Sequence, residues 1–283
     1  MLIKQYREQF VQKLSSLYDV MEAESFFYLI LENRHQMKRI DLIINPELAF
    51  SIEEIKKWDA ILEQLLLEIP IQYVLGTAHF YGLEFEVNEN VLIPRPETEE
   101  LVDWIINDCR LNKQSNIKVL DIGTGSGCIA ISLAKNLDEA QVSAIDISDK
   151  ALETACKNAL DNGVVVDFYE KNILETTALE QQFDIIVSNP PYVRQLEKSE
   201  IKKNVLDNEP HLALFVADHD ALVFYRKIAG LAQQNLVGNG WLYFEINQYL
   251  GKEMIALLEE MNFRKVVLRK DIYGNDRMIK AEK

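Results

Sequence analysis

The sequence predicts an α/β protein in which a small bundle of helices precedes a seven-stranded, mostly parallel sheet. Apolar residues recur at helical spacing through the first 75 residues, and short apolar runs alternate with helical patterns from residue 117 onward. The last two apolar runs have only a turn between them. Strand–helix alternation indicates a parallel sheet covered by helices on both faces, and the closing pair indicates an antiparallel hairpin at the sheet edge.

Residues 1–75 are expected to form an N-terminal helical domain. Ser51 and Glu54 have the spacing of a capping box, in which each side chain accepts a hydrogen bond from a free backbone amide of the first helical turn. Behind them, Trp58 and Leu62 lie on one face of the predicted helix, and Pro70 is expected to end the bundle.

Residues 76–98 are expected to form a β-hairpin and a linker. Apolar and polar residues alternate from Leu83 to Val87, and residues 88–90 read Asn-Glu-Asn, which is typical of a turn, so the hairpin is predicted to bend there. The following segment, IPRPETEELV (93–102), is expected to start a helix near its second proline. Residues 99–283 then form the large domain with the sheet.

The elements of the large domain follow from alternating patterns. Strands are expected at 117–121, 141–146, 164–169, 183–188, 241–246, 263–269 and 276–282, and helices at 127–137, 148–162, 219–236 and 249–261. About thirty residues separate Asn189 from the helix near Asp220, a length that compact domains use for functional loops. Because apolar residues occur throughout it, this connection is predicted to be an ordered lid.

Composition narrows the class of protein. The 283 residues carry a formal net charge of −15, whereas nucleic-acid binders usually present a basic surface. No apolar run is long enough to span a membrane, and the N-terminus does not have the layout of a secretory signal, so a cytoplasmic protein is expected. The three cysteines form no Cys-x-x-Cys pair and the four histidines form no cluster, which argues against disulfides and against a metal site.

A glycine-rich turn is expected to hold a ligand at the end of the first strand of the large domain. In VLDIGTGSG, Asp121 precedes the loop Gly123, Thr124, Gly125, Ser126 and Gly127, and Asp146 ends the next strand. Glycines allow a backbone to approach a ligand closely, and a carboxylate at the position of Asp146 can accept hydrogen bonds from two ribose hydroxyls.

The spacing of the glycines separates two classes of ligand. Dinucleotide sites use Gly-x-Gly-x-x-Gly, which places a pyrophosphate at a helix N-terminus. Here the pattern is Gly-x-Gly-x-Gly, and the carboxylate of Asp121 would repel a pyrophosphate but suits a cationic ligand such as S-adenosylmethionine. Asn172, after the third strand, is either an adenine contact or a turn residue.

A second site is predicted at the end of the fourth strand, where DIIVS runs into Asn189, Pro190, Pro191 and Tyr192. Carboxyl ends of parallel strands meet at one sheet edge, so Asn189 is expected to face the same crevice as Asp146. The Asn189 side-chain oxygen and the Pro190 carbonyl can each accept one N–H of a planar NH₂ group, which would aim the nitrogen lone pair at a methyl donor. The prolines restrict the backbone, and Tyr192 can stack on the flat acceptor.

These motifs resemble one family, the release-factor glutamine N5-methyltransferases, within the class of Asn-Pro-Pro-Tyr amino methyltransferases. The resemblance covers nearly the whole chain and includes GTGSG, NPPY, PIQYVLG (70–76), FYGLEF (80–85), IPRPETEELV (93–102), NEPHLAL (208–214) and GNDR (274–277). It implies a Rossmann-like seven-stranded methyltransferase sheet. It also implies methylation of the side-chain amide nitrogen of the glutamine in the Gly-Gly-Gln motif of peptide chain release factors, which act in translation termination, with S-adenosyl-L-homocysteine as the second product.

The resemblance also implies roles for individual residues. The loop from Gly123 to Gly127 and Asp146 would bind S-adenosylmethionine, and Asn189 to Tyr192 would hold the glutamine side chain. Arg95, Glu97 and Thr98 would help shape the acceptor side, and Glu209, with Pro210, would bind the substrate from the lid. Two departures stand out: Lys171, Asn172 and Ile173 occupy the position where the family often has Ser-Asp and an aromatic residue, and Asn247 replaces the glycine of Glu-Ile-Gly.

Two competing hypotheses use the same residues differently. A nucleic-acid amino methyltransferase could clamp a base at Asn189, but it would need a basic groove and base flipping. A non-catalytic module could keep the fold and only dock a partner. The acidic charge and the IPRPETE segment favour a protein substrate, with no direct nucleic acid or membrane contact, and we expect a monomer.

Overall fold

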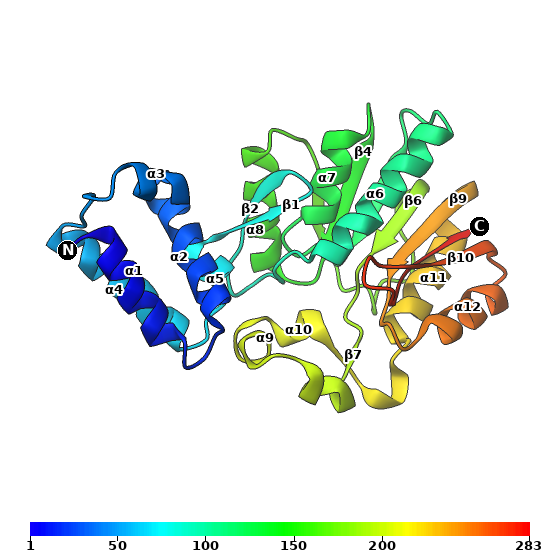
Figure 1. Cartoon of the computed structure of the whole chain (residues 1–283). Coiled ribbons are helices and arrows are strands. Elements are labelled where there is room, and N and C mark those ends of the chain that lie inside the picture. The colour runs from blue at the N-terminus through cyan, green and yellow to red at the C-terminus, as the bar shows by residue number, and fades with distance from the viewer. The chain divides into compact units, whose positions relative to one another are not determined.

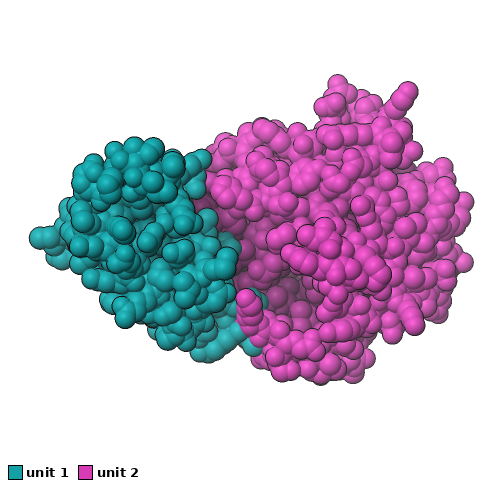
Figure 2. All heavy atoms as spheres, in the orientation of Figure 1, with its two compact units in different colours: residues 1–76, 203–208 teal, residues 77–202, 209–283 magenta.

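The computed structural model describes residues 1–283. The chain divides into two compact units, one formed by Met1–Gly76 with Lys203–Asn208 and the other by Thr77–Lys202 with Glu209–Lys283. Figure 2 colours these units separately. None of the helices is both long and apolar enough to cross a membrane.

The first unit is helical, as its apolar periodicity predicts. Its helices are α1 (Ile3–Leu14), α2 (Val20–His35), α3 (Arg39–Ile44), α4 (Ile52–Leu66), α5 (Ile71–Leu75) and, from later in the chain, α9 (Lys203–Asn208). Trp58 is buried, and its ring lies 4.8 Å from that of Phe27 and 5.1 Å from that of Phe50. The capping box is confirmed, because Ser51 N donates to Glu54 Oε2 at 2.7 Å and Glu54 N donates to Ser51 Oγ at 3.2 Å.

The second unit begins with a hairpin whose turn differs from the prediction. Strand β1 (Thr77–Phe80) pairs antiparallel with β2 (Leu83–Glu86), so the chain reverses at Tyr81 and Gly82. Both residues have positive φ, 49° and 74°, which a two-residue turn between twisted strands requires. The predicted bend at 88–90 is therefore wrong as a hairpin: Asn90 N donates to the Asn88 side chain at 3.0 Å in a local turn, and the next element is a helix that begins at Pro96.

The large sheet is confirmed as seven-stranded, in the order β10-β11-β9-β6-β3-β4-β5. Its strands are β3 (Lys118–Ile122), β4 (Gln141–Asp146), β5 (Asp167–Glu170), β6 (Phe183–Ser188), β9 (Leu236–Glu245), β10 (Arg264–Lys270) and β11 (Asp276–Glu282). Strands β5, β4, β3, β6 and β9 are parallel, and β11 runs antiparallel to both β9 and β10. The closing hairpin therefore lies at the sheet edge, as predicted.

Two strands, β5 and β9, begin several residues away from their predicted starts, whereas β3 and β10 are each displaced by one residue. Val164–Val166 have the β-branched side chains of a strand, but pairing with β4 begins only at Asp167, opposite Ser143. Val164 N instead donates to Ala159 O and closes the preceding helix. Strand β9 begins at Leu236, five residues before the predicted start, across a register shift beside β6.

Helices cover both faces of the sheet (Figure 1). They are α6 (Pro96–Leu111), α7 (Cys128–Asn136) and α8 (Asp149–Asp161) on one face, and α11 (Val223–Asn235) and α12 (Gly251–Glu260) on the other. Val119 and Ile185 pack on the first face, and their neighbours Leu120 and Ile186 pack on the second. This alternation follows the period of two along each strand, and it explains why the central strands are apolar throughout.

The long connection after β6 consists of short ordered elements. They are β7 (Val193–Arg194), η1 (Gln195–Glu200), α9, α10 (His211–Leu214), β8 (Phe215–Val216) and η2 (Asp218–Asp220). Strands β7 and β8 pair in parallel, so the two ends of the connection are held together. Its central helix α9 groups with the first unit, where Lys203 Nζ lies 2.7 Å from Glu68 Oε2.

Candidate active site

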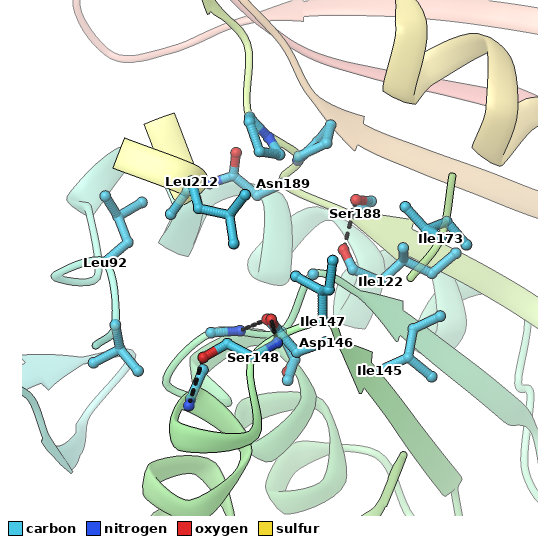
Figure 3. A pocket seen from close by; sticks show the side chains of 18 of the residues that line it. Leu92, Ile122, Ile145, Asp146, Ile147, Ser148, Ile173, Ser188, Asn189 and Leu212 are labelled. Atoms are coloured by element: carbon cyan, nitrogen blue, oxygen red, sulfur yellow. Dashed lines mark hydrogen bonds between the residues drawn. The ribbon is translucent and has the colours of Figure 1, made fainter. Parts of the chain in front are cut away.

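A cavity of about 400 Å³ lies at the carboxyl ends of the parallel strands of the second unit. Strand β3 lies between β4 and β6. The chain adds β4 and β5 on one side of β3 and then crosses to β6 on the other side, and open parallel sheets bind ligands beside such a reversal of strand order. Figure 3 shows Asn189 and Leu212 on one side of the cavity and Asp146 and Ser148 on the opposite side. The two sites predicted from sequence therefore share one cavity.

The glycine-rich loop after β3 lines this cavity at Gly123, Thr124, Gly125 and Ser126. A Cβ added to Gly125 would meet no atom within 4 Å, but the φ of this residue is +55°, which disfavours other side chains. Gly127 does not line the cavity. A Cβ there would lie 2.8 Å from Ile131 Cδ1 and 3.2 Å from Ala155 Cβ, so this third glycine permits α7 to pack against α8.

Asp146 is held by the backbone on both sides. Its Oδ2 accepts from Gly125 N at 2.8 Å, and its Oδ1 accepts from Ser148 N at 3.0 Å (Figure 3). Each carboxylate oxygen has a further lone pair. Because Asp146 lines the cavity, these lone pairs are available to a ligand with two adjacent hydroxyls.

Asp121 lies behind the loop and does not line the cavity. It is fully buried, its Oδ2 accepts from Thr124 Oγ1 at 2.6 Å, and its Oδ1 has no hydrogen-bond partner. Burial raises the pKa of this carboxyl to about 7, and the hydrogen bond from Thr124 only partly opposes the shift. The carboxyl therefore becomes fully charged only above about pH 7, and it does not reach the cavity surface.

Replacing Asp121 with asparagine is expected to raise the free energy of unfolding of the ligand-free protein at pH 8. The folded carboxyl keeps its proton up to about pH 7, whereas the unfolded one loses it near its ordinary pKa of 3.8, so wild-type stability falls as the pH rises from about 4 to about 7. That pKa difference corresponds to roughly 4 kcal/mol at most. Urea denaturation at pH 4.5 and pH 8 measures the effect.

The exposed Asp138→Asn serves as the control for this experiment, since it removes a carboxyl that is not buried. If the free energy of unfolding depended on pH equally in the wild type and in the Asp121→Asn protein, the raised pKa of Asp121 would be refuted.

The end of β6 is fixed beside β3. Ser188 Oγ donates to Ile122 O at 2.6 Å, and the next residue, Asn189, lines the cavity together with Pro190 and Pro191. Asn189 Nδ2 donates to Thr98 Oγ1 at 3.4 Å, and no hydrogen bond within the chain uses Asn189 Oδ1. A neutral acceptor is thus available at the position that the sequence predicts.

Tyr192 does not line the cavity. Its hydroxyl donates to Glu245 Oε1 at 3.0 Å, and its ring packs against the core beneath α11. The prediction that the Tyr192 ring stacks on the acceptor is therefore not met in this structure, because the hydrogen bond to the buried Glu245 carboxylate holds the phenol away from the cavity.

The residues expected on the acceptor side divide into two groups. Arg95 and Thr98 line the cavity, whereas Glu97 and Glu209 do not. Glu209 is buried, and its carboxylate binds Arg95 Nη2 at 2.7 Å and accepts from Ile93 N at 3.3 Å. It therefore fastens the long connection to the segment before α6.

Both departures from the family pattern have defined contacts. Asn172 lines the cavity, and its Oδ1 also accepts from Leu174 N at 3.1 Å, so one side chain closes a turn and faces the ligand space. Asn247 is buried, and its Nδ2 donates to Tyr192 O at 3.1 Å and to Glu197 Oε2 at 2.8 Å. The residue that replaces glycine thus ties the Asn-Pro-Pro-Tyr corner to the connection that follows it.

Sequence reasoning missed Glu245, which binds two residues of the site. It is 1% exposed, and it accepts from Thr98 Oγ1 at 2.6 Å as well as from Tyr192. The available signal was a carboxylate within the apolar run WLYFEI, since buried carboxylates are rare unless they are paired.

The order of the sheet, the glycine-rich turn after its first strand and the Asn-Pro-Pro-Tyr corner after its fourth strand define a Rossmann-like amino methyltransferase. Comparison with known proteins identifies the family. A model described as the PrmC N-terminal domain matches residues 5–76, and one described as the methyltransferase small domain matches residues 108–214.

Two curated relatives match along nearly their whole length. The release factor glutamine methyltransferase of Flavobacterium psychrophilum is 64% identical over 282 residues, covering 99% of both chains. That of Bacteroides thetaiotaomicron is 44% identical over 273 residues, covering 96% of this chain and 97% of the relative. The chain belongs to the release factor glutamine methyltransferase family.

Among solved structures, the T. thermophilus 16S rRNA N2 G1207 methyltransferase, in complex with AdoMet and guanosine, is similar in fold. It is 21% identical with a TM-score of 0.54, covering 73% of this chain and 49% of that chain. At this identity the likeness concerns the fold alone.

Proposed function

We propose that this protein transfers a methyl group from S-adenosyl-L-methionine to the side-chain amide nitrogen of the glutamine in the Gly-Gly-Gln motif of peptide chain release factors. One observation carries the proposal: in a chain that is 64% identical to a release factor glutamine methyltransferase, Asn189 and Asp146 line the same cavity. The products are the N5-methylated glutamine and S-adenosyl-L-homocysteine.

The cavity residues fit S-adenosylmethionine. Asp146 offers acceptors for two ribose hydroxyls, Gly123 to Ser126 bring the backbone to the ligand, and the buried Asp121 lies behind the loop with one oxygen unpaired. Asn172 is available to the adenine ring. When bound, S-adenosylmethionine supplies an electrophilic methyl group.

The catalytic task of Asn189, Pro190, Pro191 and Tyr192 is to hold an amide. The lone pair of an amide nitrogen is delocalised, as the rotation barrier of about 18–20 kcal/mol for peptide bonds indicates. Asn189 Oδ1 and the Pro190 carbonyl accept the two N–H groups and orient the nitrogen, with Pro191 and Tyr192 supporting the corner. Arg95 and Thr98 shape the acceptor side from the cavity wall, Glu209 holds Arg95 from behind it, and Glu97 stays assigned to this side by the family pattern alone. The excess proton on the methylated nitrogen passes to water.

The Asn189 side chain is uncharged, and this matters for the proposed reaction. A carboxylate in place of the Asn189 amide would attract the sulfonium and compete as its counterion, whereas an amide oxygen aligns the acceptor without adding a charge.

The proposal also covers the domain division of the chain, its cellular location, its partners and its oligomeric state. Residues 1–75 form a helical domain, residues 76–98 the hairpin and linker, and residues 99–283 the methyltransferase domain, a division that the match of one family model to residues 5–76 supports. The substrate is a translation factor, so the reaction belongs in the cytoplasm. The net charge of −15 supports a protein substrate without direct nucleic acid contact, and we assign a monomer that acts without a membrane.

The test is incubation of the purified protein with methyl-labelled S-adenosylmethionine and either a release factor, RNA or DNA. Label is expected only in the release factor, at the glutamine of Gly-Gly-Gln, as located by mass spectrometry of its peptides. A release factor in which this glutamine is replaced by alanine is the matched control and should remain unlabelled. Label confined to RNA or DNA would reverse the proposal in favour of a base-modifying enzyme.

A further inference from the structure

Behind the cavity, one buried carboxylate is connected to the catalytic amide through a hydroxyl. Glu245 Oε2 accepts from Thr98 Oγ1 at 2.6 Å, and Thr98 Oγ1 accepts from Asn189 Nδ2 at 3.4 Å. Thr98 is 2% exposed and Glu245 is 1% exposed, so water does not compete for the bond between them, whereas Asn189 is half-buried at the cavity.

The direction of each bond in this chain is determined by the chemistry of its members. A threonine hydroxyl has a single proton, and an ionised carboxylate can only accept. Because Thr98 gives its proton to Glu245, its oxygen can only accept from Asn189. Asn189 must therefore turn its NH₂ group toward Thr98.

The second oxygen of Glu245 is also engaged by a donor. Tyr192 donates its hydroxyl to Glu245 Oε1 at 3.0 Å, so both oxygens act as acceptors. Burial and the nearby Glu245 raise the pKa of Tyr192, which keeps the phenol protonated and able to donate. Burial raises the pKa of Glu245, and its two hydroxyl donors and the charge of Arg277 oppose that shift only in part, so the ionised carboxylate depends on those donors.

We propose that Thr98 and Glu245 are positioning residues that set the orientation of the Asn189 amide, so that Oδ1 and not Nδ2 faces the acceptor. This inference rests on the proposed function, in which the acceptor is an NH₂ group. An inverted Asn189 would present N–H to N–H, a contact without a hydrogen bond, and the two orientations have the same shape. Sterics cannot choose between them, but the hydrogen-bond chain from Glu245 can.

Kinetics test this assignment with an isosteric change. Thr98→Val removes the hydroxyl and keeps the volume, and it is expected to lower kcat for release-factor methylation by about 10- to 100-fold, the range seen when a catalytic group is slightly misplaced. The KM for the release factor and the Kd for S-adenosylmethionine should each stay within about threefold, because Asn189 remains present and the glycine loop is unchanged. Thr98→Ser restores the hydroxyl and should recover most of the rate.

Two further variants separate positioning from general damage. Glu245→Gln can donate to Thr98 and release the Thr98 proton toward Asn189, so it should slow catalysis although Thr98 is intact. Thr154→Val is the matched control: Thr154 is a buried threonine in α8, 5% exposed, and does not line the cavity. It should keep wild-type kcat, and thermal unfolding should verify that all variants fold.

A spectroscopic readout addresses the orientation directly and does not depend on the acceptor. In protein labelled with ¹⁵N-asparagine, the side-chain NH₂ signals of Asn189, assigned by their loss in Asn189→Ala, should shift and exchange faster with solvent in Thr98→Val. They should be preserved in Thr98→Ser and in Thr154→Val.

Any one of three results would overturn the inference. They are a wild-type kcat in Thr98→Val, an equal loss of kcat in Thr98→Ser and Thr98→Val, and Asn189 side-chain NMR signals that are the same in Thr98→Val as in the wild type. Failure of the wild-type protein to methylate any release factor would instead remove the proposed function, and the NMR comparison would then decide on the Asn189 orientation by itself.

Discussion

Asn189→Ala is expected to lower kcat for release-factor methylation by about 100- to 1000-fold, the effect of removing one preorganised hydrogen-bonding group from an active site. The side-chain oxygen is the acceptor that orients the substrate nitrogen, and the backbone carbonyl of Pro190 alone cannot fix two N–H groups. Asp146 lies on the side of the cavity opposite Asn189 (Figure 3), and neither it nor the glycine-rich loop is changed by this substitution. The Kd for S-adenosylmethionine, measured by calorimetry, should therefore change by less than about threefold.

Asn189→Asp is the informative companion, because it keeps an oxygen acceptor and the same shape. The new carboxylate cannot donate to Thr98 Oγ1, as Asn189 Nδ2 does, and it adds a negative charge beside the cationic methyl donor. We expect slow methylation together with tighter binding of the cofactor. Methylation by Asn189→Ala at the wild-type rate would refute the clamp mechanism, whereas a parallel loss of cofactor affinity would assign Asn189 to cofactor binding instead.

Local patterns were sufficient to predict most of the sheet. Strands β4, β6 and β11 begin and end at the residues that the sequence indicates, since each is a short apolar or alternating run bounded by polar residues or glycine. Val164–Val166 mislead for a simple reason. β-branched side chains favour extended backbone, but whether they join the sheet depends on the partner strand, and pairing with β4 starts only at Ser143.

The hairpin turn could not be placed from the sequence, because only one of its two strands has a clear alternating pattern. The alternation from Leu83 onward correctly predicts one strand. The turn-like Asn-Glu-Asn sequence at 88–90 places the hairpin turn after this strand, whereas the turn actually precedes it. The actual turn, Tyr81–Gly82, contains only one residue typical of positive φ. The other, Tyr81, has a φ of 49°, and its N donates to Glu99 at 2.8 Å. That contact joins residues 18 positions apart and is invisible to local reasoning.

Motif spacing located the candidate site residues, but their supports could not be predicted. Asn189, Asp146 and the glycine loop follow strands, so sheet topology brings them together without further information. Glu245 meets Thr98 across 147 positions and Tyr192 across 53, because β9 lies next to β6 and α6 packs against β9. Such a partner is found only once the order of the strands is known.

Asp146→Ala is expected to raise the Kd for S-adenosylmethionine by about 100-fold or more, since hydrogen bonds to charged groups contribute about 1.5–3 kcal/mol each and two ribose hydroxyls lose their acceptor. The loss has a second component. Without the carboxylate, Gly125 N and Ser148 N lose the partners that now accept from them at 2.8 Å and 3.0 Å, so the loop that cradles the ligand is no longer held in place.

Asp146→Asn distinguishes these components, because its single oxygen can still accept from one backbone amide while the charge is gone. An intermediate Kd, about 10-fold above that of the wild type, is expected if charge and geometry both contribute. Methylation at saturating S-adenosylmethionine should retain most of its rate in Asp146→Asn, since Asn189 is unaffected. Wild-type affinity in Asp146→Ala would show that the cofactor is held elsewhere in the cavity, and the assignment of its ribose to the end of β4 would then be wrong.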